Sequence, residues 1–303
     1  MKKQLLISLK EKSLFVLMVL LFVSSFNMTA QDAKETPENI FVEIACFKAK
    51  APGAVGLFRT WGKSFNEELI RQGVLKNWYF YAVDFPNGED CECNYREVRT
   101  FTDMKSLDKL NSEDFTMRVA KKVFPEENIE EMMMQFREKV TFQHSIVYVL
   151  EDELIPGGNN NLKFYDLTPG GIMGSNMIVV NYMDVKAGMG DEYVKMETEV
   201  FKPVHAASQK AGELIDWSVW QRVLPYGSSF DHNYLTVDVW GSYKKMANAN
   251  MEAAWKEVYP DKSPADVYSK MADTRDLLKA EIWIELAKAH EVPDVYNVNS
   301  IED

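Results

Sequence analysis

One stretch of this chain occurs twice. Residues 73–107 align without gaps to residues 212–246, an offset of 212 − 73 = 139 positions, and nine of the 35 aligned pairs are identical. The identical pairs are Gly73/Gly212, Leu75/Leu214, Trp78/Trp217, Pro86/Pro225, Gly88/Gly227, Asn94/Asn233, Tyr95/Tyr234, Val98/Val237 and Lys105/Lys244. A repeat at a fixed offset dictates the architecture, because each copy forms the same unit of structure. The chain is therefore expected to contain two similar units.

Each copy reads as a glycine that ends a helix, a strand beginning at Trp, a Pro-x-Gly loop and a strand beginning at Asn-Tyr. A β-rich run and an apolar stripe of helical spacing precede the first copy, the stripe being Leu57, Trp61, Phe65 and Leu69. Pro203 is expected to kink the corresponding helix of the second copy, at 191–210. The predicted strands are 40–47, 77–84, 94–101 and 145–150, then 177–183, 216–223, 233–240 and 280–286. With helices after the first and third strands of each set, the order is β-α-β-β-α-β, the ferredoxin-like arrangement.

A four-stranded sheet with helices on one face needs a partner for its other face. The nearest partner is the second copy, so we predict an α+β fold in which two ferredoxin-like repeats pack sheet to sheet as a pseudo-dimeric α+β barrel. With the duplicated Trp, Pro-x-Gly and Asn-Tyr pattern, this topology resembles the dimeric α+β barrel superfamily over residues 40–290. That superfamily includes antibiotic-biosynthesis-monooxygenase-like, stress-responsive barrel and NIPSNAP-like proteins. The resemblance implies a fold that carries many unrelated functions.

The same patterns divide the chain into segments. These are a signal peptide at 1–30, a polar leader at 31–39, repeat 1 at 40–154, a glycine-rich linker at 155–176, repeat 2 at 177–290 and a C-terminal tail at 291–303.

The N-terminus is typical of a secretory signal. Lysines precede an unbroken apolar run of ten residues at 14–23, which is too short to span a bilayer. We place cleavage after Ala30 and expect a secreted or periplasmic protein with no membrane insertion; a retained N-terminal anchor is the alternative. Removal of 1–30 leaves 34 − 4 = 30 basic and 46 − 1 = 45 acidic residues, a net charge of 30 − 45 = −15. Such a charge repels nucleic acid, which is therefore excluded as a partner.

The three cysteines are Cys46, Cys91 and Cys93. Cys91 and Cys93 lie in a loop, where the second copy has Phe230 and His232. A structural metal there would show only two ligands where zinc requires four, so no metal is expected. Local redox pairing of the two is an alternative to plain surface thiols.

Side-chain alternation along the strands sorts the two faces of each sheet. In 233–240, Leu235, Val237 and Val239 form one apolar face, which we assign to the helices. The same reasoning places an aromatic set with embedded charges between the sheets as candidate ligand-binding residues: Tyr81, Tyr95, Glu97, Arg99, Tyr148, Trp220, Arg222, Tyr234, Asp238, Glu281 and Trp283. Unpaired buried charges are costly. They are therefore expected either to pair, Arg99 with Asp238 for example, or to line a ligand cavity.

Haem is the cofactor to test, because some barrels of the resembled superfamily bind it through an axial ligand that is usually His. Of the four histidines, His205 alone lies well inside a predicted element, and no motif surrounds it. We expect no cofactor, haem included.

Three functions stay open at this point. The first is an exported protein, monomer or homodimer, that binds a small partly aromatic or cationic molecule between the sheets. The second is a metal-independent monooxygenase- or isomerase-like enzyme, with Glu97, Asp238 and Glu281 as acid–base candidates, so enzyme activity is undecided. The third is a structural or assembly protein with a filled barrel and an exposed apolar helix face.

Overall fold

The computed structural model describes residues 39–88, 91–154, 177–227 and 230–290, all within the unit Asn39–Asp303. The expected signal peptide, linker and C-terminal tail, and the leader up to residue 38, lie outside the described residues.

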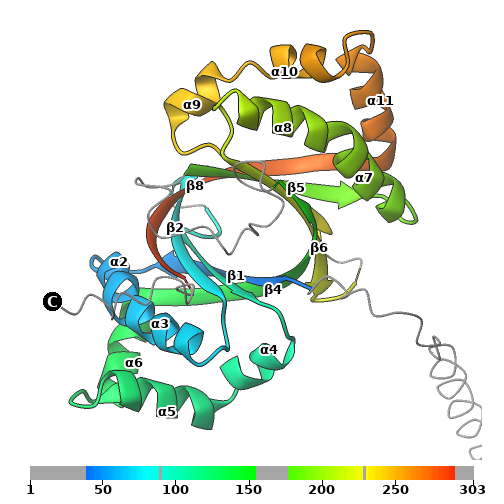
Figure 1. The fold of residues 1–303 in the computed structure, drawn as a ribbon. Coiled ribbons are helices and arrows are strands. Elements are labelled where there is room, and N and C mark those ends of the chain that lie inside the picture. Colours follow the sequence, from blue (N-terminus) through cyan, green and yellow to red (C-terminus); the bar gives the residue numbers. More distant parts are fainter. Residues whose placement is uncertain (1–38, 89–90, 155–176, 228–229, 291–303) are drawn as a thin grey trace, which may run out of the picture. The chain divides into compact units, whose positions relative to one another are not determined.

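Eight antiparallel strands close into one barrel, in the order β1-β3-β2-β8-β5-β7-β6-β4 (Figure 1). The strands are β1 (Phe41–Ala49), β2 (Asn77–Phe85), β3 (Tyr95–Phe101), β4 (Val140–Glu153), β5 (Met177–Val185), β6 (Asp216–Leu224), β7 (Tyr234–Val239) and β8 (Arg275–His290). The predicted mixture of α and β elements and the predicted barrel are both confirmed.

Helices follow the first and third strands of each half, 39–154 and 177–290. They are α2 (Ala54–Leu57), η1 (Phe58–Gly62), α3 (Lys63–Arg71), α4 (Lys105–Leu110), α5 (Glu113–Val123), α6 (Ile129–Lys139), α7 (Gly190–Met196), η4 (Glu197–Phe201), α8 (Lys202–Lys210), α9 (Tyr243–Asn248), α10 (Met251–Val258) and α11 (Pro264–Thr274). The glycines expected to end the first helix of each half, Gly73 and Gly212, have φ of 65° and 77°. These left-handed values suit glycine, which lacks a Cβ.

The lengths of β4 and β8 explain how the barrel closes. The sequence predicts strands at 145–150 and 280–286, whereas β4 has 14 residues and β8 has 16. Because of this length, β4 pairs with both β1 and β6, and β8 pairs with both β5 and β2. The two halves therefore join edge to edge through hydrogen-bonded ladders, rather than as two separate sheets stacked face to face. Closure leaves no strand edge of the barrel unpaired.

The barrel interior is apolar and aromatic. Leu235 and Val239 are buried in it, and Val237 packs against the same cluster. The face of β7 that alternation assigned to the helices is therefore the interior face. The predicted positions of five residues between the sheets were wrong, since these side chains lie on the helix side of β3 and β7: Tyr95, Glu97, Arg99, Tyr234 and Asp238.

The strand register explains this correction. On the β2–β3 ladder, Tyr79 lies opposite Val98 and Trp78 lies opposite Arg99. Paired residues share a face, so an interior Tyr79 places Val98 inside and Arg99 outside. The assignments on β2, β4, β6 and β8 were correct, since Tyr81, Tyr148, Trp220 and Trp283 all lie in the interior cluster.

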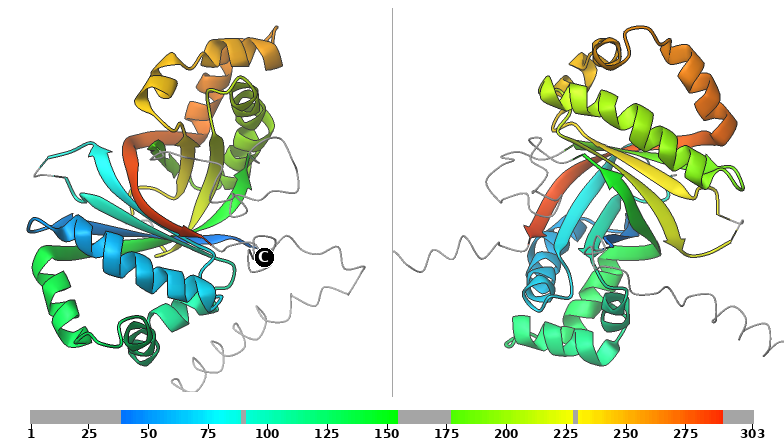
Figure 2. Two further views of the ribbon diagram at one scale, coloured as in Figure 1. Left: turned by 60° about the vertical axis from the view of Figure 1, so that its left-hand side comes forward. Right: turned by 45° about the vertical axis from the view of Figure 1, so that its right-hand side comes forward.

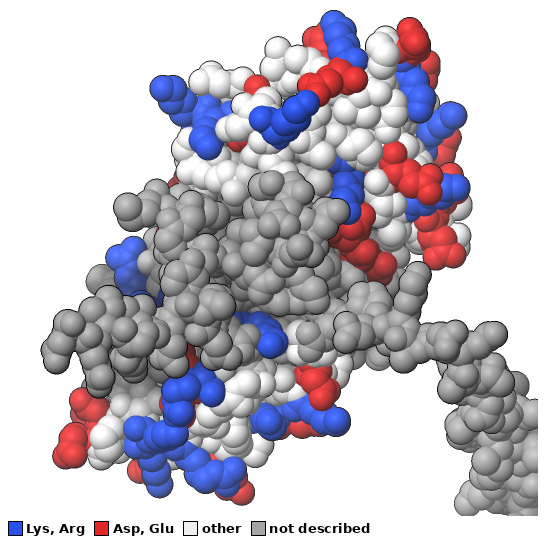
Figure 3. Space-filling model, viewed as in Figure 1, with Lys and Arg blue, Asp and Glu red and all other residues white. Residues whose placement is uncertain are grey.

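The helices form two layers on opposite sides of the barrel (Figures 1 and 2). The layer α2–α6 packs on the first half through Phe58, Leu69 and Phe136, and the layer α7–α11 packs on the second half through Phe201, Val204 and Trp255. On the face drawn in Figure 3, basic and acidic side chains are intermixed over both layers. No helix among the described residues is both long and apolar enough to cross a membrane.

Cys46 and Cys93 form a disulfide, with Cα atoms 5.5 Å apart and a sequence separation of 47. Cys91 is the free thiol among the described cysteines. The expectation of unpaired surface thiols, or of a Cys91–Cys93 pair, was wrong. Cys46 lies on β1, and antiparallel pairing with β3 brings that strand beside the start of β3, where Cys93 lies.

Candidate functional site

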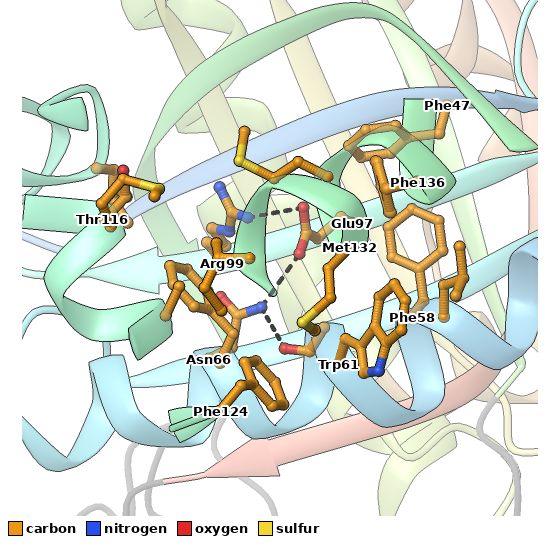
Figure 4. A pocket seen from close by; sticks show the side chains of 18 of the residues that line it. Phe47, Phe58, Trp61, Asn66, Glu97, Arg99, Thr116, Phe124, Met132 and Phe136 are labelled. Carbon is orange, nitrogen blue, oxygen red and sulfur yellow. Dashed lines mark hydrogen bonds and ion pairs between the residues drawn. The ribbon is translucent and has the colours of Figure 1, made fainter. Parts of the chain in front are cut away.

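A cavity lies between the helix layer and the sheet of the first half (Figure 4). Its volume is about 390 Å³, within the range of small-molecule sites. Aromatic and aliphatic side chains dominate the wall, among them Phe47, Phe58, Trp61, Phe124, Met132 and Phe136. The polar side chains of the lining are Asn66, Glu97, Arg99, Glu113 and Thr116.

Three of these polar residues are placed by two neighbouring elements. Glu97 and Arg99 are two positions apart on β3, so both project toward the helices. Asn66 lies on α3, which crosses that face, and its Nδ2 donates to the carbonyl of Gly62 at 2.8 Å. Glu43 joins them from β1, where it lies opposite Arg99. These four polar side chains lie together at the base of the apolar cavity, and we refer to Glu43, Asn66, Glu97 and Arg99 as the floor.

The floor is a connected hydrogen-bond network. Glu97 Oε1 accepts hydrogen bonds from Trp78 Nε1 at 2.7 Å and from Asn66 Nδ2 at 3.3 Å. Glu97 Oε2 pairs with Arg99 at 2.9 Å, and Arg99 also pairs with Glu43 at 3.6 Å. Asn66 Oδ1 and Arg99 Nε are buried without a partner. The network holds Glu97 and Arg99 in place at the base of the cavity.

The charges of this floor do not cancel. Burial alone would lower the pKa of Arg99, but the carboxylates of Glu97 and Glu43 outweigh it and raise that pKa above its ordinary value. Arg99 is therefore a permanent cation between two acidic side chains. With Glu113 also in the lining, the site carries excess negative charge.

The second half fills the space that the first half leaves open. The π-helical turns η1 and η4 are 197 − 58 = 139 residues apart, so Phe201 stands where the first half has Gly62. The helices α6 and α11 are 264 − 129 = 135 residues apart, and the same offset puts Trp255 in the place of Ala120. Phe201 and Trp255 are both buried, with ring centroids 6.3 Å apart. At the positions that these offsets equate, the second half thus carries two large buried aromatic side chains, where the first half has a glycine and an alanine that line the cavity.

The polar residues also differ between the halves. His205 and Asp238 stand where the first half has Asn66 and Arg99, and they approach each other at 4.0 Å. His205 stacks on Trp217, and burial lowers its pKa to about 4. Burial raises the pKa of Asp238 to about 6, although a hydrogen bond from Asn181 opposes the rise. Arg99 and Asp238 lie under different helix layers, so the predicted pair between them is wrong.

The barrel interior around Trp220 and Trp283 is nearly full. The cavity left among these side chains is about 60 Å³ and holds a few waters at most. The predicted ligand cavity along the whole inter-sheet face is therefore corrected: of the predicted residues, Tyr148 alone lines a larger cavity, of about 260 Å³, at one end of the interior. Of the predicted residues, five lie inside the barrel, namely Tyr81, Tyr148, Trp220, Glu281 and Trp283. Arg222 lies near one end of β6, where it donates to the carbonyl of Gly227.

The sequence analysis missed most of the first-half cavity. The sequence places Trp61 and Phe65 in an apolar helical stripe, and Asn66 is not among the candidate residues. The replacement of large residues by Gly62 and Ala120 was a usable signal, because two copies of one unit should fill their cores alike. That signal requires the correct alignment of both helices.

Among the described residues, one group of side chains has metal-ligand chemistry. Donor atoms of Cys46, Glu92 and His144 lie within 4.8 Å of one another. The Cys46 sulfur is bonded to Cys93, so it is not a thiolate ligand.

No family model matches the sequence, and no curated protein matches it. Several solved structures share the fold. One is a candidate monooxygenase from Fusobacterium nucleatum, with 9% identity, a TM-score of 0.49, and coverage of 85% of this chain and 97% of that one. Another is a chlorite dismutase variant from Candidatus Nitrospira defluvii, with 9% identity, a TM-score of 0.40, and coverage of 81% and 90%. A third is a heme-binding protein from Thermus thermophilus, with 11% identity, a TM-score of 0.40, and coverage of 85% and 95%. This likeness concerns the fold alone.

The last of these structures corrects one expectation. The expectation of no cofactor, haem included, was wrong as a statement about this fold, since a heme-binding protein has it. The usual axial ligands of haem are His, Cys, Tyr and Met. The first-half cavity offers Met117, Met132 and Met133, and its lining contains none of the other three residue types. Its lining therefore does not fit a His-ligated haem.

Proposed function

We propose that the protein binds a small, mainly apolar organic molecule, neutral or cationic, in the first-half cavity. The observation that carries the proposal is the cavity of about 390 Å³ itself, with its aromatic wall and its acidic floor of Glu43 and Glu97 around Arg99. An apolar ligand gains free energy by leaving water for this wall, at about 25 cal/mol for each Å² buried. An anionic ligand would meet the excess negative charge of the floor.

The asymmetry between the halves supports the choice of cavity. A stable core does not need the opening, because the second half closes the same space with Phe201 and Trp255. Empty apolar volume costs about 24 cal/mol per Å³. A chain that keeps such a volume in one half and fills it in the other is typical of a binding site. The filled barrel interior also suits an assembly protein, but it does not account for the open cavity.

The proposal also covers the architecture of the protein and its export. We propose two diverged ferredoxin-like copies of the dimeric α+β barrel type, exported as a monomer or homodimer. The Cys46–Cys93 disulfide supports export, because disulfides persist in oxidising compartments. Acid–base catalysis at Glu97 is not favoured, since its carboxylate is already engaged by Trp78, Asn66 and Arg99.

A fluorescence titration with N-phenyl-naphthylamine tests the proposal. This neutral aromatic dye brightens when it leaves water. We expect saturable binding by the native chain and a loss of at least about tenfold in affinity, roughly 1.4 kcal/mol, for Ala120→Trp, which copies the second half. Ala272→Trp is the matched control, because Ala272 is exposed on α11. Equal dye affinity in the native chain and Ala120→Trp, or no binding by either, would remove the cavity as the site.

A further inference from the structure

A second cavity, of about 260 Å³, opens where the loop after β6 meets the barrel interior. Interior side chains of Ile44, Tyr148 and Tyr182 line it on one side, and Phe230, Asp231 and His232 line it on the other. It shares no lining residue with the first-half cavity. We refer to it as the mouth cavity.

Three hydrogen-bonded side chains, Asp231, His232 and Tyr148, lie along the wall of the mouth cavity. His232 Nδ1 lies 2.7 Å from Asp231 Oδ1, and His232 Nε2 lies 2.7 Å from the hydroxyl of Tyr148. The Asp231 carboxylate can only accept, so Nδ1 carries the proton of a neutral His232. Nε2 is then an acceptor, and the Tyr148 hydroxyl donates to it. The tautomer is thus fixed by geometry, and the phenol oxygen of Tyr148 keeps lone pairs available to a ligand.

The buried cation Arg96 lies beside these three side chains. Arg96 Nη2 lies 3.0 Å from both oxygens of Glu281. Glu281 Oε2 also accepts hydrogen bonds from Tyr182 and Trp283. These contacts occupy the hydrogen-bond acceptors of the Glu281 carboxylate and fix Arg96 in one orientation. Arg96 Nε is buried and has no partner. The charge of Arg96 is close enough to oppose the effect of burial, which raises the pKa of Tyr148.

We propose that the mouth cavity is a second small-molecule site, which binds a weakly acidic hydroxyl compound of the phenol or enol class and takes its proton. The ligand O–H proton passes to the phenol oxygen of Tyr148 while the proton of Tyr148 passes to His232 Nε2. The electron pair of the broken O–H bond stays on the ligand oxygen. The products are a ligand anion, a neutral Tyr148, and an imidazolium that remains paired with Asp231.

The charged groups around the mouth cavity are compatible with this transfer. Burial lowers the pKa of His232, as do the charges of Arg222 and Lys279, against the charge of Asp231, so His232 is neutral before the ligand enters. The imidazolium forms together with the ligand anion, whose negative charge favours it. Arg96 and Lys279 are cations of the lining that offset the ligand anion, and both also pair with Glu281. Glu92 and His144 complete the titratable lining and pair with each other at 3.3 Å. Arg222 adds a nearby positive charge from β6.

The test uses para-nitrophenol, whose phenolate absorbs visible light and whose phenol does not. With the protein in excess, at a pH equal to the pKa of the free probe, we expect the phenolate-to-phenol ratio to rise about tenfold on binding. Tyr148→Phe and His232→Gln should abolish the rise. Tyr81→Phe is the matched control, because Tyr81 is a buried tyrosine of the same barrel outside the mouth lining. It should keep the rise.

Two results would overturn the proposal. One is an unchanged ratio with the native chain. The other is a rise of equal size in Tyr148→Phe and in His232→Gln, each checked for native thermal unfolding. His232 lies in a loop rather than in the barrel wall, so His232→Gln remains informative even where Tyr148→Phe lowers stability.

Discussion

Trp78 donates its indole N–H to Glu97 Oε1 over 2.7 Å, whereas the equivalent Trp217 packs its ring against His205. Position 97 is a glutamate on β3, and the matching position 236 on β7 is a threonine. One half therefore holds a buried carboxylate under its helices where the other holds a short hydroxyl. This difference leads to the first prediction.

Glu97→Ala is expected to destabilise the fold by about 3–5 kcal/mol, because it leaves Arg99 without its nearest charge partner and Trp78 without an acceptor. Urea unfolding measures the difference. Glu126→Ala, at an exposed residue, is the control and should change little. A loss of less than about 1 kcal/mol in the free energy of unfolding for Glu97→Ala would contradict the burial of this network, because a loss of that size is typical of an exposed ion pair.

Cys46→Ser is expected to lower stability by about 4 kcal/mol, because the disulfide closes a loop of 47 residues in the unfolded chain. Cys91→Ser should leave stability unchanged, since Cys91 is not in the bond. Thermal unfolding with and without a reductant compares the two. If reductant destabilised Cys46→Ser as much as the native chain, the Cys46–Cys93 bond would not be the one that matters.

Glu197→Gln is expected to change how stability depends on pH. Burial raises the pKa of Glu197 to about 7 from an ordinary value of 4.5, so the folded state binds more protons than the unfolded state between these limits. The contribution of Glu197 to stability therefore falls as the pH rises through this window. Relative to the native chain, Glu197→Gln should gain up to about 3 kcal/mol between about pH 4.5 and pH 7.

Denaturant unfolding at several pH values, read as the difference between the two proteins, isolates this effect. The difference is needed because His205, whose pKa is lowered to about 4, contributes the opposite slope. A flat difference across the window would mean that Glu197 is not buried as described.

Trp255→Ala is expected to open in the second half the volume that the first half leaves open. Removal of this buried ring should cost about 3–5 kcal/mol. It should also create a second binding site for N-phenyl-naphthylamine, seen as a doubled stoichiometry in the titration. An unchanged stoichiometry would show that the second half collapses around the missing side chain.

Much of the fold could be predicted from local patterns. Period-2 alternation located all eight strands, helical spacing located the helices before Gly73 and Gly212, and those two glycines placed the helix ends. The ends of β4 and β8 could not be found this way, because pairing with segments distant in sequence extends both strands. Val140 and Arg275 pair within their own half, and Glu153 and His290 pair with the other half.

The site could be predicted only in part. Alternation correctly grouped Glu97 with Arg99, and Leu235 with Val237, because neighbours two apart on a strand always share a face. It could not say which face turns inward, since that depends on the register between strands, such as Tyr79 opposite Val98. The tertiary structure alone decided that the charged set lies under the helices, that Cys46 meets Cys93, and that the space beside Ala120 stays open. Each of these is a contact between segments distant in sequence, and local patterns carry no information about such distances.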